Sequence, residues 1–293
     1  MTKIVRIATR HSELALYQAR EVASRLKCDF EIVEITSSGD RDLISSLSQI
    51  GGTGIFVKEV QNALLEGRAD IAVHSAKDLP GVLPEATTIA GYLPRGDIRD
   101  AIFGSRISDL REGAIVATGS ARRRALLLSK RPDVKVVDLR GNIRSRLSKV
   151  GEVDAILVAN AALVRLGIDL ELGEIFEPEE FCPQIGQGAI AIEARLDDLS
   201  TLELVREVSD SDTFLQLTAE RSLLATLGAG CTLAVGAYSS LIGPRVSLFG
   251  MISSSDGDEF VTVKMESEDP GLLGQRAGAF LLENGGSRLL SNG

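Results

Sequence analysis

The sequence predicts an α/β protein that ends in a small α+β unit. Through the first two thirds of the chain, β-rich apolar runs alternate with segments of 3.6-residue apolar period, as in βαβ units with largely parallel sheets. After Asp212, three strand-like runs come before a final helix, a grouping typical of an α+β domain. The chain has 293 residues, 44% of them apolar, which is enough for two or three domains.

The first unit is predicted from alternating apolar runs. Its expected elements are, in order, a strand over 4–8, a helix over 13–27, a strand over 30–36, a helix over 55–66 and a strand over 70–73. Ser12 is placed to cap the first helix, whose Leu14, Ala19 and Val22 belong to one apolar stripe. The long polar and glycine-rich connection before residue 55 is of the kind that is more often functional than idle.

The segment 91–100 (GYLPRGDIRD) combines two glycines, a proline and several charges, which indicates a crossing between domains. A second α/β unit follows, with strands expected over 114–117, 135–138 and 154–158 and helices over 122–129, 142–149 and 161–166. A glycine turn and a further strand in PQIGQGAIAIEAR would re-enter the first domain. The last unit is expected to hold a helix over 213–227, strands over 233–239, 246–251 and 260–264, and a helix near 272–282.

Charge is segregated along the chain. The net charge is −9, yet residues 118–149 hold ten Lys or Arg against two Asp, so this segment is +8 and the remainder is −17. Arginine dominates the segment, and its planar fork pairs with a carboxylate or phosphate through two parallel hydrogen bonds. The segment therefore predicts a site for defined anions.

Arg122, Arg123 and Arg124 follow Thr118-Gly119-Ser120 where a strand gives way to a helix. The unpaired N–H groups of a helix N-terminus favour anions, and arginines there reinforce such a site. Arg140 follows the next strand and should face the same crevice, because ligands bind at the carboxyl ends of strands in open α/β sheets. The alternative is a solvated helix face, which we prefer for Arg124 and Arg144.

A second group of polar residues, His74 to Pro80 (HSAKDLP), follows a buried strand. It places an imidazole, an ammonium and a carboxylate where active groups gather in α/β folds. A carboxylate there would stabilise a developing cation or relay a proton. The alternative is a loop ion pair beside a structural histidine; His11 is expected on the surface.

Three cysteines, Cys28, Cys182 and Cys231, are too few and too far apart for a disulfide framework or a zinc site, and we expect no metal. Cys231 lies in a glycine-rich turn and is accessible there, although spacing alone favours an inert thiol. The glycine-rich GGTG and GQG segments lack a following Walker lysine and are weak phosphate-loop signals.

Composition narrows the classes of function. No apolar run reaches the roughly 18 residues of a membrane span, and the first residues lack the apolar core of a signal peptide, so we expect a cytoplasmic protein without membrane contact. A pI near 5.0 and 4% aromatic residues disfavour nucleic acid as a partner.

Six blocks of the chain together closely resemble the porphobilinogen deaminase family, also called hydroxymethylbilane synthase. They are RIATRHSELAL (6–16), GGTGIFVKEVQNALLEGRADIAVHSAKDLP (51–80), ATGSARRR (117–124), LRGNIRSRLSK (139–149), IGQGAIAIEARLDD (185–198) and ERSLLATLGAGC (220–231). The resemblance implies two domains like those of type II periplasmic binding proteins, hinged around a cleft, plus a small third domain. We place domain 1 at 1–93 and 189–206, domain 2 at 99–182 and domain 3 at 211–293.

The resemblance also implies an activity and a cofactor. A dipyrromethane would be attached by a thioether to Cys231, which reverses the inert interpretation of that thiol. The enzyme, a monomer, would add four porphobilinogen units head to tail with loss of ammonia and release the linear tetrapyrrole hydroxymethylbilane by hydrolysis. Each pyrrole carries acetate and propionate side chains, so the growing chain is a polyanion that suits the arginine-rich segment.

Residue roles follow from the matching positions. Asp78 corresponds to the family's catalytic aspartate. The cofactor-binding positions, besides Cys231 and Asp78, are Lys77, Thr118, Ser120, Arg122, Arg123 and Arg140. The substrate-binding positions are Arg10, Ser12, Phe56, Arg146, Arg165 and Gln187.

Four positions depart from the family's usual residues. Gln49 and Thr53 stand where many relatives carry lysines, Gly119 replaces a serine, and Ala234 replaces a proline after Cys231. None removes the aspartate, the cysteine or the arginine core, so we expect an active enzyme. A binding protein that holds a carboxylate without chemistry is the alternative class, and a nucleic-acid binder a distant third.

Overall fold

The structure is a computed structural model that describes residues 4–36, 57–170, 172–228 and 233–291. Contacts divide it into two compact units. Unit 1 comprises residues 1–96 and 188–215, and unit 2 comprises residues 97–187 and 216–293. The division into three domains made from the sequence remains a prediction.

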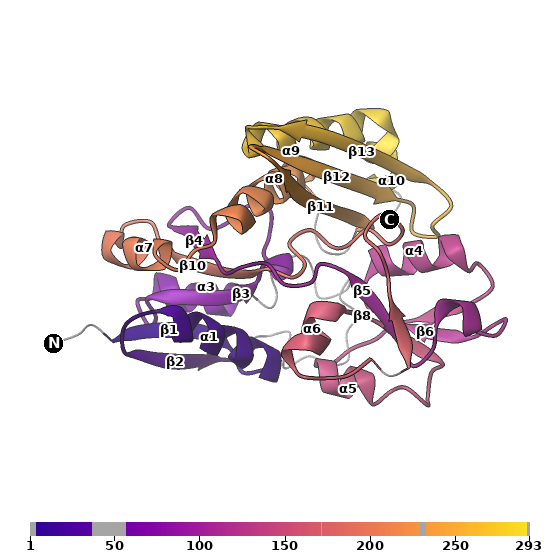
Figure 1. Ribbon diagram of the computed structural model, residues 1–293, viewed down its shortest axis with the longest axis horizontal. Coiled ribbons are helices and arrows are strands. Elements are labelled where there is room, and N and C mark those ends of the chain that lie inside the picture. Colours follow the sequence, from indigo (N-terminus) through magenta and orange to yellow (C-terminus); the bar gives the residue numbers. More distant parts are fainter. Residues whose placement is uncertain (1–3, 37–56, 171, 229–232, 292–293) are drawn as a thin grey trace. The chain divides into compact units, whose positions relative to one another are not determined.

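Unit 1 is built on a five-stranded sheet of order β2-β1-β3-β10-β4 (Figure 1). Its strands are β1 (Val5–Arg10), β2 (Phe30–Ile35), β3 (Ile71–Ser75), β4 (Thr87–Tyr92) and β10 (Ile190–Arg195). β1 pairs in parallel with β2 and β3, whereas β10 runs antiparallel between β3 and β4. The strand predicted after the glycine turn therefore lies inside the first sheet, between β3 and β4, which come much earlier in the chain.

Helices cover both faces of this sheet because its buried strands are apolar on both sides. Ile7 and Ile71 pack with helix α1 (Glu13–Arg25), while the neighbouring Ala8 and Ala72 pack with α3 (Lys58–Leu65). Successive side chains of a strand point to opposite faces, so one strand serves two cores. Helix α7 (Leu199–Arg206) adds Val205 to the α1 side.

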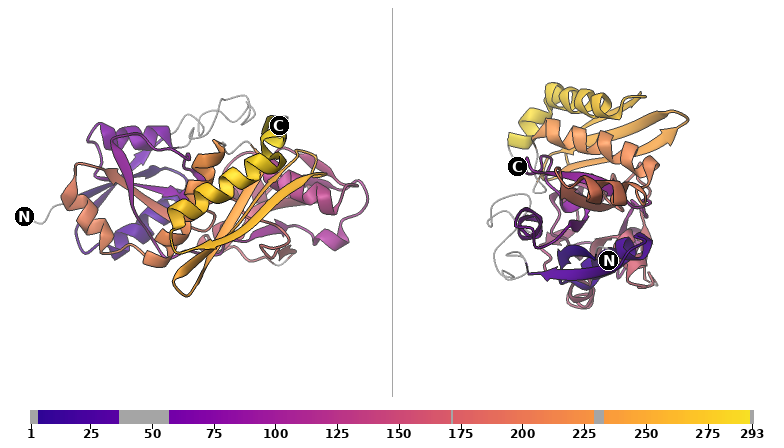
Figure 2. Two further views of the ribbon diagram at one scale, coloured as in Figure 1. Left: turned by 90° about the horizontal axis from the view of Figure 1, so that it is seen from above. Right: turned by 90° about the vertical axis from the view of Figure 1, so that its left-hand side faces the viewer.

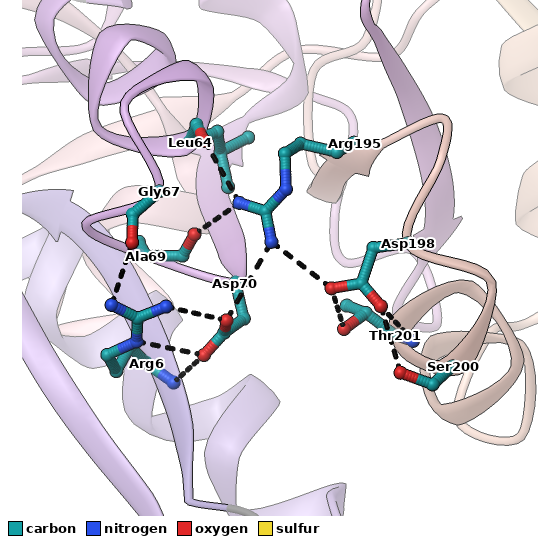
Figure 3. Close-up of polar contacts among 9 residues, drawn as sticks. All are labelled: Arg6, Leu64, Gly67, Ala69, Asp70, Arg195, Asp198, Ser200 and Thr201. Carbon is teal, nitrogen blue, oxygen red and sulfur yellow. Dashed lines mark hydrogen bonds and ion pairs between the residues drawn. The ribbon is translucent and has the colours of Figure 1, made fainter.

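Arg195, the last residue of β10, connects β10, α3 and α7 in unit 1 (Figure 3). Its Nη1 donates to the carbonyls of Leu64 and Ala69 at 2.9 and 2.7 Å, and its Nη2 lies 3.1 Å from Oδ2 of Asp198, the N-cap of α7. Asp70 lies 3.8 Å away and accepts from both Nε and Nη2 of Arg6. Arg195 thus adds a donor to one C-terminal carbonyl of α3, that of Leu64, and to the carbonyl of Ala69 just before β3.

Unit 2 repeats the same sheet topology, in the order β7-β6-β8-β5-β9. Its strands are β5 (Asp100–Phe103), β6 (Ile115–Ala117), β7 (Lys135–Val137), β8 (Ala155–Ala159) and β9 (Gly173–Ile175). β6 is parallel to β7 and β8, and β5 is antiparallel to β8, as β10 is to β3. The helices are α4 (Ala121–Lys130), α5 (Ile143–Leu147) and α6 (Asn160–Arg165).

The C-terminal part of unit 2 is an antiparallel sheet of order β11-β12-β13. Its elements are β11 (Val235–Ile242), β12 (Arg245–Ser253), β13 (Phe260–Ser267), α9 (Pro270–Leu281) and α10 (Ser287–Ser291), with α8 (Ser211–Leu227) leading in. Helix α9 lies across the sheet (Figure 2). Leu248 and Ile252 pack towards α8 and α9, whereas Phe249 and Met251 join the core formed by α4, so alternate residues of β12 serve two cores.

The predicted fold class is confirmed: two α/β sheets precede a small α+β part. The helices and strands expected from the sequence occur with bounds shifted by a few residues. Strands β4, β5 and β9 and helices α7 and α10 are absent from the elements expected from the sequence. No helix in the described ranges is long and apolar enough to cross a bilayer.

Candidate anion-binding site

The arginine-rich segment begins at the carboxyl end of β6, where Thr118-Gly119-Ser120 leads into α4. Ser120 is the N-cap: its Oγ accepts from the backbone N–H of Arg123 at 3.4 Å. Oγ1 of Thr118 accepts from the backbone N–H of Ser120 at 3.3 Å. The two hydroxyls therefore fix the turn that brings Arg122 and Arg123 into the first turn of the helix.

Arg122 is buried rather than solvated, with 2% of its surface exposed, and its partner Asp100 is fully buried. Nη1 of Arg122 donates to Oδ2 of Asp100 at 2.7 Å and to the carbonyl of Cys182 at 2.5 Å. A solvated helix face, the alternative considered from the sequence, does not describe this arginine.

Arg123 shares the same carboxylate. Its Nε donates to Oδ1 of Asp100 at 2.9 Å, its Nη2 lies 2.7 Å from the same oxygen, and its Nη1 donates to the carbonyl of Leu157 at 3.1 Å. The amide of Gln187 donates to Oδ1 of Asp100 at 2.9 Å and to the carbonyl of Ile98 at 2.8 Å. Gln187 therefore supports the buried pair through its side-chain N–H groups.

Electrostatics keep this cluster charged. Burial raises the pKa of Asp100, but the charges of Arg122 and Arg123 and the hydrogen bonds from Arg122 and Gln187 lower it by more, to about 2. Burial lowers the pKa of Arg123, which Asp100 partly offsets. An arginine stays protonated in proteins, so these three side chains carry a net charge of +1 as a group. A further fully buried carboxylate of unit 2, Glu220, accepts from the backbone N–H of Gly186 and from Oγ of Ser239.

Two donors of Arg122 are left over. Its Nε and Nη2 are buried and have no hydrogen-bond acceptor among the residues that the structure describes. A buried, unpartnered charged donor costs several kcal/mol, so such atoms point to a ligand that is not part of the chain. An anion fits these donors.

The other basic residues of the segment lie nearer the surface. Arg140 follows β7 and is half-buried, and Arg146 on α5 donates from Nε to the carbonyl of Gly141 at 2.7 Å. Arg165, the last residue of α6, is also half-buried. Arg124 and Arg144 are exposed, which confirms the expectation for these two side chains. Since β7, β6 and β8 are parallel neighbours, Arg140 and the α4 arginines follow adjacent strand ends.

Unit 1 carries a corresponding set at its own strand ends. Arg10 ends β1, and Ser12 caps α1 by accepting from the backbone N–H of Ala15 at 3.4 Å. Lys77 and Asp78 form a 3₁₀ turn, residues Ala76–Asp78, directly after β3, and both are half-buried. Because β1 and β3 are parallel neighbours, these four residues follow adjacent strand ends of one sheet.

His74 has a structural role and is not part of the polar loop that follows it. It is buried in β3, and its Nε2 lies 3.0 Å from Oε2 of the fully buried Glu193. Glu193 also accepts from Nε2 of Gln61 and from Oγ1 of Thr87, the latter at 2.5 Å. His11 is exposed, as expected.

Some predicted residues cannot be placed. Phe56 and Cys231, with Gln49 and Thr53, lie outside the described residues. Of the other cysteines, Cys182 is buried, and burial raises the pKa of its thiol. A thiol of this kind is unreactive.

Asp100 is the residue that sequence reasoning missed. It lies at the edge of the segment 91–100, whose glycines and charges suggested an exposed crossing. The signal that could have found it is the apolar run that it opens, Asp100–Phe103 (DAIF), because a charge at the start of a buried strand needs a partner.

The fold and these residues define an α/β protein whose cationic side chains gather at the carboxyl ends of its strands, where ligands bind in folds of this class. Residues 5–203 match the family model described as "Porphobilinogen deaminase, dipyromethane cofactor binding domain". Residues 214–283 match "Porphobilinogen deaminase, C-terminal domain".

Curated relatives agree with the family models. A porphobilinogen deaminase from Nitrobacter winogradskyi is 42% identical over 97% of this chain and 95% of its own length. A porphobilinogen deaminase from Brevibacillus brevis is 39% identical over 98% of this chain and 96% of its own length. A solved periplasmic binding protein from Brucella ovis is more distant, at 14% identity and a TM-score of 0.41 over 69% of this chain and 65% of its own.

The chain belongs to the porphobilinogen deaminase family. It is a transferase of tetrapyrrole biosynthesis, with a dipyrromethane cofactor-binding domain.

Proposed function

We propose that this chain acts as a hydroxymethylbilane synthase in which Asp78 is the catalytic carboxylate and Cys231 the point of cofactor attachment. Four porphobilinogen molecules would be joined head to tail, each with loss of ammonia, before hydrolysis releases the linear tetrapyrrole. The observation that carries the assignment of the anion site is the pair of buried, unpartnered donors on Arg122.

The residues of unit 2 fit a dipyrromethane. When bound, that group supplies the covalently held primer to which pyrrole units are added. Its acetate and propionate side chains are anions, and Arg122 has two buried donor atoms without an acceptor in the described part of the chain. Arg122 and Arg123 would neutralise those carboxylates, assisted by Thr118, Ser120 and Arg140.

Asp78 is suited to the chemical step by its type and by its position after β3. Loss of ammonia from porphobilinogen leaves a cation on the substrate's methylene carbon. A fixed carboxylate stabilises such a charge without having to reorganise, and it can also accept hydrogen bonds from pyrrole N–H groups.

Substrate carboxylates would be bound by Arg10, Arg146 and Arg165, with Ser12 as a hydroxyl donor and Phe56 against the pyrrole ring. Gln187 acts differently in this scheme. Both donors of its amide are engaged with Asp100 and Ile98, so its effect on the substrate would pass through Arg123. These assignments rest on the family's motif positions and on the donors present at each strand end.

We also propose that the active protein is a cytoplasmic monomer with the three-domain division given above. The chain needs no second copy to supply any residue named here. Gel filtration with light scattering would check this, and a dimer that dissociates with loss of activity would contradict it.

Intact-protein mass spectrometry tests the cofactor assignment. The wild-type chain should carry two pyrrole units, and Cys231→Ser should carry none, whereas Cys182→Ser should keep the adduct because Cys182 is buried. A bare wild-type mass would favour a binding protein. An adduct retained in Cys231→Ser would exclude that thiol as the attachment site.

Asp78→Asn tests the catalytic role. The half-buried side chain changes little in shape, so the fold and the adduct should remain while tetrapyrrole formation falls by roughly 10²-fold or more. Asp109→Asn, an exposed carboxylate of the same type in unit 2, is the control. Tetrapyrrole formation by Asp78→Asn near the wild-type rate would exclude the assignment.

A further inference from the structure

Asp100 is a fully buried carboxylate to which the proposed reaction gives no role. It is the first residue of β5, and both of its oxygens are used within unit 2. Oδ2 accepts a hydrogen bond from Arg122, and Oδ1 accepts hydrogen bonds from Arg123 and Gln187. Its three side-chain partners indicate that Asp100 organises the arginines of the anion site.

Adjacent residues of a helix point about 100° apart. Without a common partner, Arg122 and Arg123 would direct their guanidiniums to different sides of α4. The carboxylate of Asp100 prevents this, since it accepts 2.7 Å hydrogen bonds or ion pairs from both side chains, one on each oxygen. Two consecutive arginines thereby converge on one point.

The two guanidiniums are nevertheless held by different edges. Arg123 presents its Nε and Nη2 to Asp100, which is the edge that makes two parallel hydrogen bonds to a carboxylate. Arg6 uses the same edge on Asp70 elsewhere in the chain. Arg122 instead presents Nη1, which is shared between Asp100 and the carbonyl of Cys182. Its Nε–Nη2 edge is therefore kept free of partners from the described chain.

We infer that Asp100 is a positioning residue for the reaction: it holds Arg122 by Nη1 so that the Nε–Nη2 edge stays available for one carboxylate of a pyrrole ligand. This inference rests on the proposed function, because it takes the dipyrromethane or the chain grown on it as that ligand.

The test compares the full-length variant Asp100→Asn with Asp154→Asn. Asp154 is the matched control: it is a half-buried carboxylate of unit 2 that accepts from Arg111 and from the backbone N–H of Ile115, at the opposite end of β6 from Thr118. Both variants should lower Tm. Only Asp100→Asn should lower the fraction of folded chains that carry the two-pyrrole adduct, by roughly ten-fold or more, the equivalent of one lost charged hydrogen bond.

Asp100→Glu covers the case in which Asp100→Asn does not fold. It keeps the charge but moves the carboxylate by one methylene group, so the chain should fold while the loaded fraction falls at least about three-fold and KM for porphobilinogen rises. A merely structural role would move Tm alone. Wild-type loading and KM in whichever of the two variants folds would overturn the inference. If the wild-type chain itself carried no adduct, the proposed function would fail instead.

Discussion

Nε2 of His74 lies 3.0 Å from Oε2 of Glu193 in the interior of unit 1, and this contact joins β3 to β10 just before the turn that carries Lys77 and Asp78. Glu193 has no water-exposed surface, and its oxygens are shared among His74, Gln61 and Thr87. A buried carboxylate with this set of donors is stabilised only as long as its charge is present.

Glu193→Gln should therefore lower the free energy of unfolding by about 3 kcal/mol, because the amide NH₂ would face groups that now donate hydrogen bonds to the carboxylate. Urea unfolding followed by circular dichroism measures the change. Glu203→Gln, on the exposed side of α7, should change stability by less than about 0.5 kcal/mol. Equal effects for the two variants would contradict the role given to Glu193.

Acid should destabilise the fold by protonating two buried carboxylates, Glu193 and Asp100. Burial raises the pKa of Glu193, but the hydrogen bond and charge of His74, with the hydrogen bonds of Thr87 and Gln61, bring it below its usual value. The pKa of Asp100 is about 2. A folded-state pKa below the unfolded one adds stability above the unfolded value, near pH 4, and this stability is lost as the pH falls towards the folded value.

The unfolding free energy should thus fall between about pH 5 and pH 2, and Glu193→Gln and Asp100→Asn should each make that fall shallower. Urea titrations at several pH values in this window provide the measurement. Parallel curves for wild type and both variants would show that neither carboxylate contributes.

Arg195→Met should cost about 2 kcal/mol, because the carbonyls of Leu64 and Ala69 each lose one hydrogen bond and Asp198 loses a partner, while the aliphatic stem is largely kept (Figure 3). Hydrogen exchange should increase first in α3, whose C-terminal turn this side chain secures. Arg206→Met, exposed in α7, is the control. Unchanged exchange in α3 would argue against the connection.

Gly236→Ala should disturb the anion site from a distance. An added Cβ would lie 2.9 Å from Sγ of Cys182, 2.9 Å from the carbonyl of Pro183 and 3.0 Å from Cδ of Arg122. We expect a loss of about 1–3 kcal/mol and a lower fraction of adduct-carrying chains, since Arg122 must shift to make room. Gly271→Ala, whose Cβ would meet only Oδ1 of Asp269 at 3.4 Å, should be nearly neutral. Calorimetry measures the change in stability, and intact-protein mass spectrometry measures the fraction of chains that carry the adduct. A wild-type adduct fraction in Gly236→Ala would show that Arg122 tolerates the added methyl group.

Much of the fold could be predicted from sequence because its core elements have strong local patterns. The helix over Glu13–Arg25 has a capping serine and an apolar stripe, and the strand over Ala155–Ala159 is a continuous apolar run. Strand β4 (TTIAGY) has no such pattern and the apolar run of strand β5 (DAIF) is only three residues long, and each pairs with strands far along the chain. Their existence depends on those partners more than on their own residues.

The candidate site divides in the same way. The basic character of residues 118–149 is visible in composition, and the exposure expected for Arg124 and Arg144 is confirmed. The different edges that Arg122 and Arg123 present to Asp100 are not visible, because that pairing joins β5 to α4 across 22 residues. A tertiary contact of this kind leaves no periodic trace in the chain.

The place of β10 in the first sheet bears on how the protein is made. Among the described strands, β4 pairs with β10 alone, and β10 comes almost a hundred residues after it. At typical translation rates that interval lasts several seconds, during which β4 has left the ribosome without a partner and β3 has one open edge. The first unit can therefore close only after the α/β part of the second has been synthesised, and those exposed edges are where a nascent chain would need protection from aggregation.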